Sequence, residues 1–172
     1  YDFGTGFTAA VGYAGPETGI MTEESTDAYG INAAYTGDNY GVSVTYGLVE
    51  TSTVDEDTFT AFNAYYAPEG FPSISVGYEI GEDGSVADKD ADELSSFFVG
   101  LSWDEVGPGS AGVAMGTRTP TVQGTDEQYM YEIYYSYPIN DGMTITPLVF
   151  VSENTTPTDD ETGVMVKTSF SF

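Results

Sequence analysis

Hydrophobic and polar residues alternate one by one along most of the chain. Between Tyr40 and Leu48 every second residue is Tyr, Val or Leu, and the residues between them are Gly, Ser or Thr. Successive side chains of a β-strand point to opposite faces, so this pattern predicts strands with one apolar face and one polar face. The period of about 3.6 residues that is typical of an amphipathic helix is not found.

The alternation recurs in ten segments that are separated by short and long connections in turn. The predicted strands cover residues 1–14, 28–36, 40–49, 58–67, 71–81, 95–103, 110–118, 128–138, 142–152 and 162–172. Regular alternation of short and long connections predicts an antiparallel up-and-down meander. A repeat of about 32 residues has the length of one strand pair, which agrees with a meander. The chain is therefore predicted to form a single all-β domain, 1–172.

Acidic residues are concentrated in the connections. The chain carries 28 acidic and 3 basic residues, for a formal charge of −25, and most of the acids lie in the five long connections. Only Asp2, Glu79 and Glu132 fall within the predicted strands, all on the polar face. Because phosphate binding needs clustered Lys and Arg, nucleic acid is not an expected partner.

The chain contains neither His nor Cys. This excludes nucleophilic catalysis by Ser-His or Cys-His pairs, and it excludes zinc sites built from His or thiolate ligands. The acidic cluster at 88–93 lacks the spacing of a calcium-binding loop, so we interpret it as solvated. We expect no enzymatic activity, no cofactor and no metal.

Two architectures are compatible with strands that have one apolar face. In a soluble β-sandwich that face forms the core, whereas in a transmembrane β-barrel it contacts lipid. The polar face here is mainly Gly, Ser, Thr, Ala and Asn, and aromatic residues lie near the strand ends with aliphatic residues between them. Two aromatic girdles around a lipid band have this distribution, which favours an antiparallel up-and-down transmembrane β-barrel. The predicted girdle residues are Tyr13, Tyr29, Tyr35, Tyr40, Tyr46, Tyr66, Tyr78, Trp103 and Tyr137.

The last predicted strand alternates to the final residue of the sequence. Val164, Val166, Phe170 and Phe172 lie on its apolar face. A terminal aromatic residue after alternating apolar residues resembles the assembly signal of bacterial outer-membrane barrels, which would assign that role to Phe170 and Phe172. An even strand number would place both termini at the periplasmic, short-turn side and the long acidic loops outside. The expected location is the outer membrane of a Gram-negative bacterium, in contact with its lipid.

A more specific resemblance rests on the segment from Tyr131 to Phe172. Its Ile-Thr-Pro at 145–147, the following Phe150, an Asp-rich loop and the final Val-Lys-Thr-x-Phe-x-Phe are similar to the C-terminal end of cyanobacterial Som-type porins. Those porins are related to OprB-type carbohydrate-selective porins. The resemblance implies a homotrimeric channel for passive diffusion of small hydrophilic solutes, sugars and ions, in a cyanobacterium.

Members of that family normally carry an N-terminal S-layer-homology segment and a coiled coil, which these 172 residues do not include, and more than ten strands. The chain is therefore either the C-terminal part of a larger porin or a small ten-stranded barrel. Small residues on the polar face favour a lumen wider than ten strands enclose, although large side chains would narrow it. These larger residues are Tyr65, Phe98, Tyr134 and Phe150.

The polar face also supplies candidate pore-lining residues. A transverse electric field across the lumen would arise if Glu79 and Glu132 faced Arg118 and Lys167. In the alternative, the two bases only pair with neighbouring acids and support the wall. The polar or aromatic candidates for contact with sugars, with wall packing as the alternative role, are Asn32, Asn63, Tyr65 and Tyr134. Acidic loops at the outer mouth would concentrate cations, so we expect a cation-preferring pore. The alternatives are a closed barrel that serves as an anchor or in surface recognition, and a soluble acidic β-domain.

Overall fold

The computed structural model describes residues 1–15, 27–50, 56–84, 93–119, 121–122, 124–154 and 159–171. Within these ranges, no helix has the length and apolar character that a membrane crossing requires. The strands are β1 (Phe7–Ala14), β2 (Ala28–Thr36), β3 (Tyr40–Glu50), β4 (Glu56–Tyr66), β5 (Ser73–Glu82), β6 (Glu93–Val106), β7 (Gly109–Thr117), β8 (Thr121–Val122), β9 (Tyr129–Asn140), β10 (Met143–Ser152) and β11 (Glu161–Phe170).

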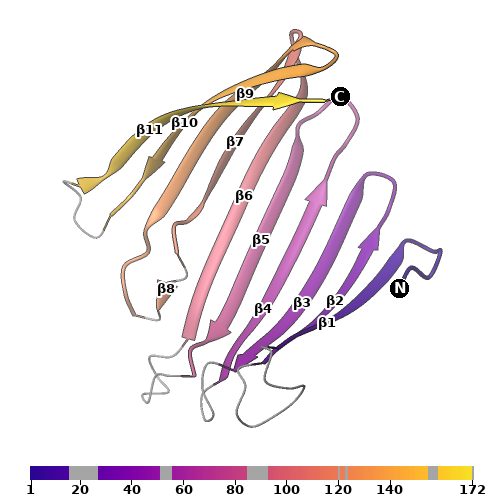
Figure 1. The fold of residues 1–172 in the computed structure, drawn as a ribbon, viewed down its shortest axis with the longest axis vertical. Coiled ribbons are helices and arrows are strands. Elements are labelled where there is room, and N and C mark those ends of the chain that lie inside the picture. The colour runs from indigo at the N-terminus through magenta and orange to yellow at the C-terminus, as the bar shows by residue number, and fades with distance from the viewer. Residues whose placement is uncertain are drawn as a thin grey trace.

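All of these strands belong to one antiparallel sheet (Figure 1). Its order is β1-β2-β3-β4-β5-β6-β7-β9-β10-β11, with the two-residue β8 paired to β6 outside this path. This order confirms the predicted up-and-down meander, because each long strand pairs with the next long strand along the chain. The ten predicted strands correspond to the ten strands of the main path. The prediction missed β8, since two residues are too few to show an alternation.

Several strands extend further than the sequence pattern predicted. The statement that only Asp2, Glu79 and Glu132 lie within strands is therefore wrong. Asp2 forms an isolated bridge with Thr8 outside the named strands. Backbone ladder bonds continue past the last apolar residue, so polarity alone ends a strand too early. The acidic residues that this brings together in cross-strand pairs are Glu50 with Glu56 and Glu82 with Glu93.

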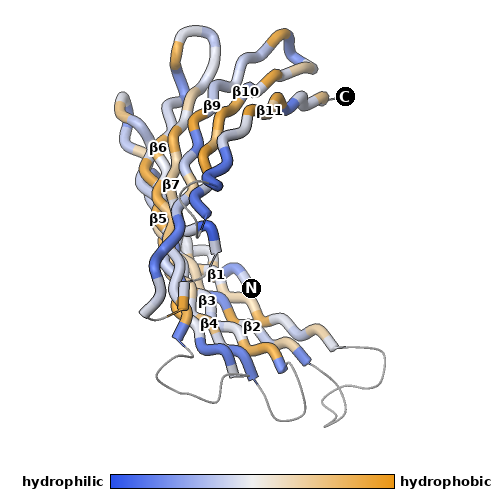
Figure 2. The backbone as a smooth tube through the Cα atoms, turned by 90° about the vertical axis from the view of Figure 1, so that its left-hand side faces the viewer, coloured by the Kyte–Doolittle hydropathy of each residue, from blue (hydrophilic) through white to orange (hydrophobic). Residues whose placement is uncertain are grey.

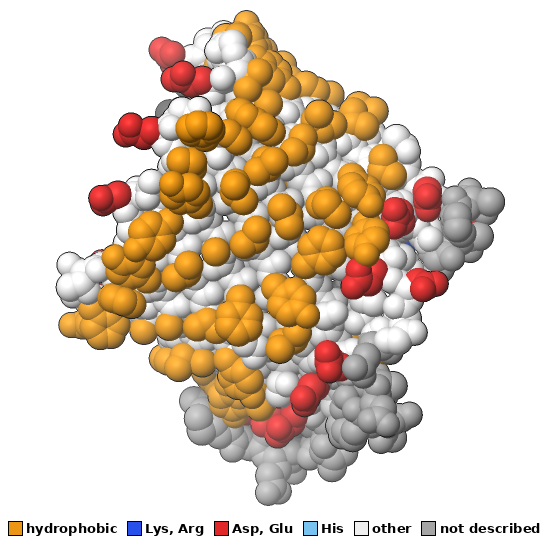
Figure 3. Space-filling view, turned by 180° about the vertical axis from the view of Figure 1, so that it is seen from behind, with side chains coloured by type: hydrophobic (Ala, Val, Ile, Leu, Met, Phe, Trp, Pro, Cys, Tyr) orange, Lys and Arg blue, Asp and Glu red, His pale blue; other side chains and the backbone are white. Residues whose placement is uncertain are grey.

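The sheet is a single curved layer whose two faces differ in polarity. Figure 2 shows that it is open on one side, and Figure 3 shows rows of apolar side chains on the convex face, with acidic residues beyond both ends of the rows. In the described part of the chain no apolar side chain is buried, and Val11 and Val164 are 84% and 75% exposed. An aqueous domain normally buries such residues, so the convex face is built for an apolar environment.

The strands are tilted relative to the band of aromatic residues. One row of cross-strand partners begins at Tyr35, near the short-turn end of β2, and reaches Tyr131, at the long-connection end of β9. A row of hydrogen-bonded partners therefore crosses the apolar band diagonally. Tilt and register stagger of this kind are what a sheet needs in order to curl into a barrel. In the described residues the curl is incomplete, because β1 pairs only with β2 and β11 only with β10.

Large rings on the concave face lie across glycines of neighbouring strands. A Cβ atom added to Gly47 would lie 2.0 Å from Cζ of Phe59, and one added to Gly41 would lie 2.4 Å from Cε1 of Tyr65. The space left by the missing side chain is thus filled by an aromatic ring from the adjacent strand. Such pairs cover strand glycines and fix the register of the sheet.

The substitution Gly47→Val is expected to lower the free energy of unfolding by about 1–3 kcal/mol, because the new side chain overlaps the Phe59 ring. The matched control is Gly12→Val. Gly12 lies in the same register row, and a Cβ there has no described heavy atom within 4 Å. The measurement is a urea titration of protein refolded into lipid vesicles. Equal urea midpoints for the two variants would show that packing of the Phe59 ring over Gly47 does not contribute to stability.

Candidate functional site

The concave face forms a continuous polar wall from β1 to β11. Two register rows carry most of its candidate residues. The first row runs through Asn32, Thr45, Ala61, Glu79 and Ser96. The second runs through Gly41, Tyr65, Ser75, Gly100, Ala114, Glu132 and Phe150. Because side chains alternate between faces, every residue of these rows lies on the concave side.

The four charged candidates are spread along this wall. Glu79 is half-buried between Ala61 and Ser96, whereas Glu132 is exposed. Lys167 lies in the edge strand β11, opposite Thr146. The register thus places Glu79, Glu132 and Lys167 against neutral cross-strand partners.

Arg118 follows the end of β7 at the long-connection end of the sheet. Its Nη1 donates a hydrogen bond to Oε1 of Gln128 at 3.4 Å and another to Oδ1 of Asn154. Both acceptors are neutral amides, so neither of these two bonds is an ion pair. The transverse field between bases and acids stays a prediction.

The uncharged candidates are held in the wall to different degrees. Nδ2 of Asn32 donates to Oγ1 of Thr45 at 2.8 Å and to the Val44 carbonyl at 3.3 Å, so this amide is already engaged. Tyr65 and Tyr134 lie across glycines, as described for Phe59. Asn63 is exposed on the concave side of β4. Of the four, Asn63 and Tyr65 are exposed, whereas Asn32 and Tyr134 are half-buried.

The predicted girdle residues lie on the convex face. They form two lines, one toward each end of the strands, and each line crosses the rows of cross-strand partners at an angle. Near the long-connection end lie Tyr13, Tyr29, Tyr46 and Tyr78, and near the short-turn end lie Tyr35, Tyr40, Tyr66, Trp103 and Tyr137. Phe170 is on the convex face at the short-turn end, opposite Met143. Phe172 is outside the described residues. Contact with membrane interfaces and a role in assembly stay predictions.

Sequence reasoning missed a set of contacts between tyrosines and carboxylates at the long-connection end. Asp27 is 1% exposed, and its carboxylate accepts hydrogen bonds from the Tyr13 hydroxyl at 3.0 Å and the Tyr29 hydroxyl at 3.2 Å. Glu153 accepts from the Tyr129 backbone N–H at 3.1 Å. Charge-assisted bonds of this kind fix the ends of the long connections to the aromatic line. In the sequence, these contacts could have been expected from an acidic residue that lies next to a strand end containing tyrosine.

A second missed feature is the hydrogen bonding that stabilises the wall itself. Oγ1 of Thr146 donates to Oγ of Ser136 at 3.1 Å across β9 and β10. The hydroxyl of Tyr135 donates to the Val106 carbonyl at 2.8 Å and so holds the turn between β6 and β7. These contacts depend on which strands are neighbours, and a single strand pattern does not contain that information.

Comparison with known proteins gives one match. A family model described as Gram-negative porin matches residues 1–156, a range that includes β1 to β10 and ends before β11. No significant match was found among curated proteins or among solved structures.

Proposed function

The chain belongs to the Gram-negative porin family, and from this membership we propose that its concave face lines a water-filled channel. Membership of that family implies a location in the outer membrane and a porin function in general. The observation that supports the channel best is the contrast between the two faces of a single-layer sheet. Lipid against the apolar convex face takes the place of the hydrophobic core that the described residues lack.

The channel that we propose is wider than ten strands would enclose. The sheet has ten strands on its main path, and its edges at β1 and β11 are not joined to each other. A strand edge within a bilayer leaves backbone N–H and C=O groups without partners, so both edges have to be paired. In this proposal further strands pair with them, and the two edges do not pair with each other. The strong curvature in Figure 2 and the small residues on the concave face agree with a larger barrel.

In this proposal the channel prefers cations, because its two ends carry a net negative charge and its wall does not. On the described wall, Glu79 and Glu132 are balanced by Arg118 and Lys167. Acidic residues flank the apolar band at both ends (Figure 3). A mouth lined by one sign of charge concentrates counter-ions and repels ions of the same sign.

The permeant solutes that we propose are small and hydrophilic, including ions and sugars. Carbohydrate passage, a cyanobacterial source and assembly as a homotrimer are supported by the resemblance of residues 131–172 to Som-type porins. The same resemblance supports extracellular exposure of the long acidic connections and a periplasmic position for the short turns.

Conductance of the full-length native protein in a planar lipid bilayer tests the channel. Stable current steps are expected in potassium chloride. If correctly inserted protein gave no steps, the closed barrel that serves as an anchor or in surface recognition would replace the porin. Extraction from cells by buffer without detergent would instead favour the soluble acidic β-domain.

A further inference from the structure

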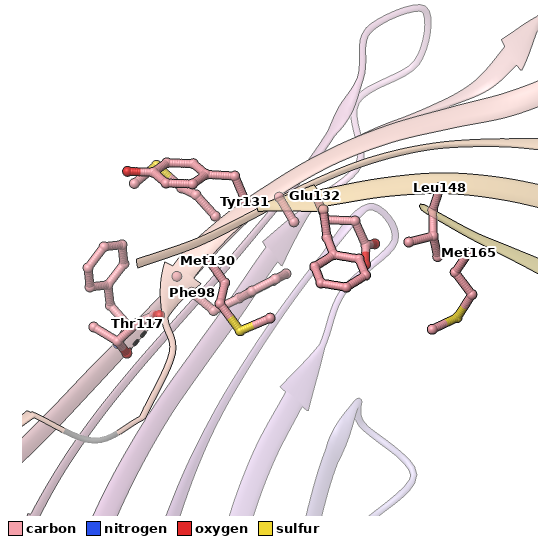
Figure 4. A pocket seen from close by; sticks show the side chains of 12 residues that line it. Phe98, Thr117, Met130, Tyr131, Glu132, Leu148 and Met165 are labelled. Carbon is pink, nitrogen blue, oxygen red and sulfur yellow. Dashed lines mark hydrogen bonds between the residues drawn. The ribbon is translucent and has the colours of Figure 1, made fainter. Parts of the chain in front are cut away.

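An apolar depression of about 480 Å³ lies in the concave wall where β6, β7, β9, β10 and β11 meet (Figure 4). In the figure Met130, Glu132, Leu148 and Met165 project from the same side of the sheet, while Tyr131 projects from the other. The larger side chains that line it from the concave side are Phe98, Met130, Glu132, Leu148, Phe150 and Met165. At this place the wall therefore combines several large apolar side chains with a carboxylate.

The register places Glu132 within this region. Its cross-strand partners are Ala114 and Phe150. The Phe150 ring is held against the wall, since a Cβ added to Gly163 would lie 2.2 Å from its Cζ atom. Phe98 is held in the same way over Gly100, at 2.9 Å. The hydrophobic surface beside the carboxylate is therefore positioned by the backbone and does not have to form when a solute arrives.

Positive side chains of the described wall lie outside the depression. Arg118 is held at the long-connection end by Gln128 and Asn154. Lys167 lies beyond Met165 along β11, opposite Thr146. Glu132 is exposed, so its charge is available to a solute in the channel.

We propose that this depression is a binding subsite for permeating organic cations that carry a short apolar or aromatic group. The inference rests on the proposed channel and deepens it. The ammonium group would lie beside Glu132, and the apolar group would pack on Leu148 and Met165. Aromatic rings attract organic cations through cation–π contacts, and a thioether packs favourably against an aromatic ring. The volume lies within the usual range of small-molecule sites. A free sugar needs several hydrogen-bonding partners, and an anion is repelled by the carboxylate, so neither fits as well.

Block of the potassium current by two quaternary ammonium ions tests the subsite. Benzyltrimethylammonium carries an aromatic group, and tetramethylammonium does not. In the unmodified protein, block by benzyltrimethylammonium is expected at a lower concentration. Glu132→Gln is expected to raise that blocking concentration about threefold to fivefold, the effect of losing one exposed ion pair. Met165→Thr is expected to reduce the difference between the two ions.

The matched control is Glu79→Gln, which makes the same charge change on the same face. Its cross-strand neighbours are Ala61 and Ser96, and the pocket that it lines with Phe59 and Leu94 is smaller, at about 290 Å³, and has no methionine in its lining. This variant is expected to change block by benzyltrimethylammonium less than Glu132→Gln does. Equal block by the two ions, or equal effects of the two Glu→Gln changes, would overturn the subsite and leave the channel intact. If the unmodified protein conducted no current at all, the proposed channel itself would be overturned.

Discussion

Replacing Val44 by lysine is expected to lower the free energy of unfolding in lipid vesicles by about 2–4 kcal/mol, whereas Ser43→Lys is expected to be tolerated. The two residues are neighbours in β3 and lie at nearly the same depth. Val44 is on the convex face between Ala33 and Phe62, and Ser43 is on the concave face. A lysine on the lipid face near the middle of a bilayer costs about 2–4 kcal/mol, whereas one in a water-filled lumen keeps its hydration.

The fraction of folded protein at increasing urea concentrations measures both variants. Urea midpoints that fall sharply for Val44→Lys and little for Ser43→Lys would agree with lipid on the convex face. If Ser43→Lys were the more damaging change, the two faces would have been assigned the wrong way round.

Cation preference is expected to depend strongly on salt. The screening length falls from about 30 Å at 0.01 M to about 3 Å at 1 M ionic strength, so a field from acids at the channel mouth is almost lost at high salt. The ratio of potassium to chloride permeability should therefore fall by about tenfold over this range. Reversal potentials under a fixed salt gradient, measured at several mean concentrations, give this ratio.

A double variant, Glu79→Gln with Glu132→Gln, distinguishes the contribution of charges at the channel mouth to selectivity from that of charges on the wall. It removes both wall carboxylates and leaves the acids at the strand ends in place. If these acids control selectivity, the double variant keeps most of its preference for potassium at low salt. A preference that does not depend on salt, and that disappears in the double variant, would place the selective charges in the wall.

The fold was predictable because the alternation of side chains is a local property of each strand. The residues from Tyr40 to Leu48 show it without interruption, and the connections on either side fixed the meander. The strand ends were less predictable, because backbone pairing of Glu50 with Glu56 continues beyond the apolar band. Polarity indicates where the apolar band ends, whereas hydrogen bonds determine where the strand ends.

The candidate site was predictable only as a face, and not as an arrangement. The pattern placed Glu79 and Glu132 on the polar side, but their distance from Arg118 and Lys167 depends on the stagger between strands. The apolar depression also depends on the stagger between strands. Met130, Leu148 and Met165 interrupt the polar pattern of three different strands, and they come together only through the register of β9, β10 and β11.

Chemical labelling of single cysteines tests most directly the claim that the concave face lines water. The chain has no cysteine of its own, so each introduced thiol reports on one position. Asn63 and Phe62 are consecutive in β4 and lie on opposite faces. With protein in lipid vesicles, a charged water-soluble thiol reagent is predicted to label Asn63→Cys quickly and Phe62→Cys hardly at all. Equal labelling of the two, or faster labelling of Phe62→Cys, would contradict a water-filled channel on the concave face.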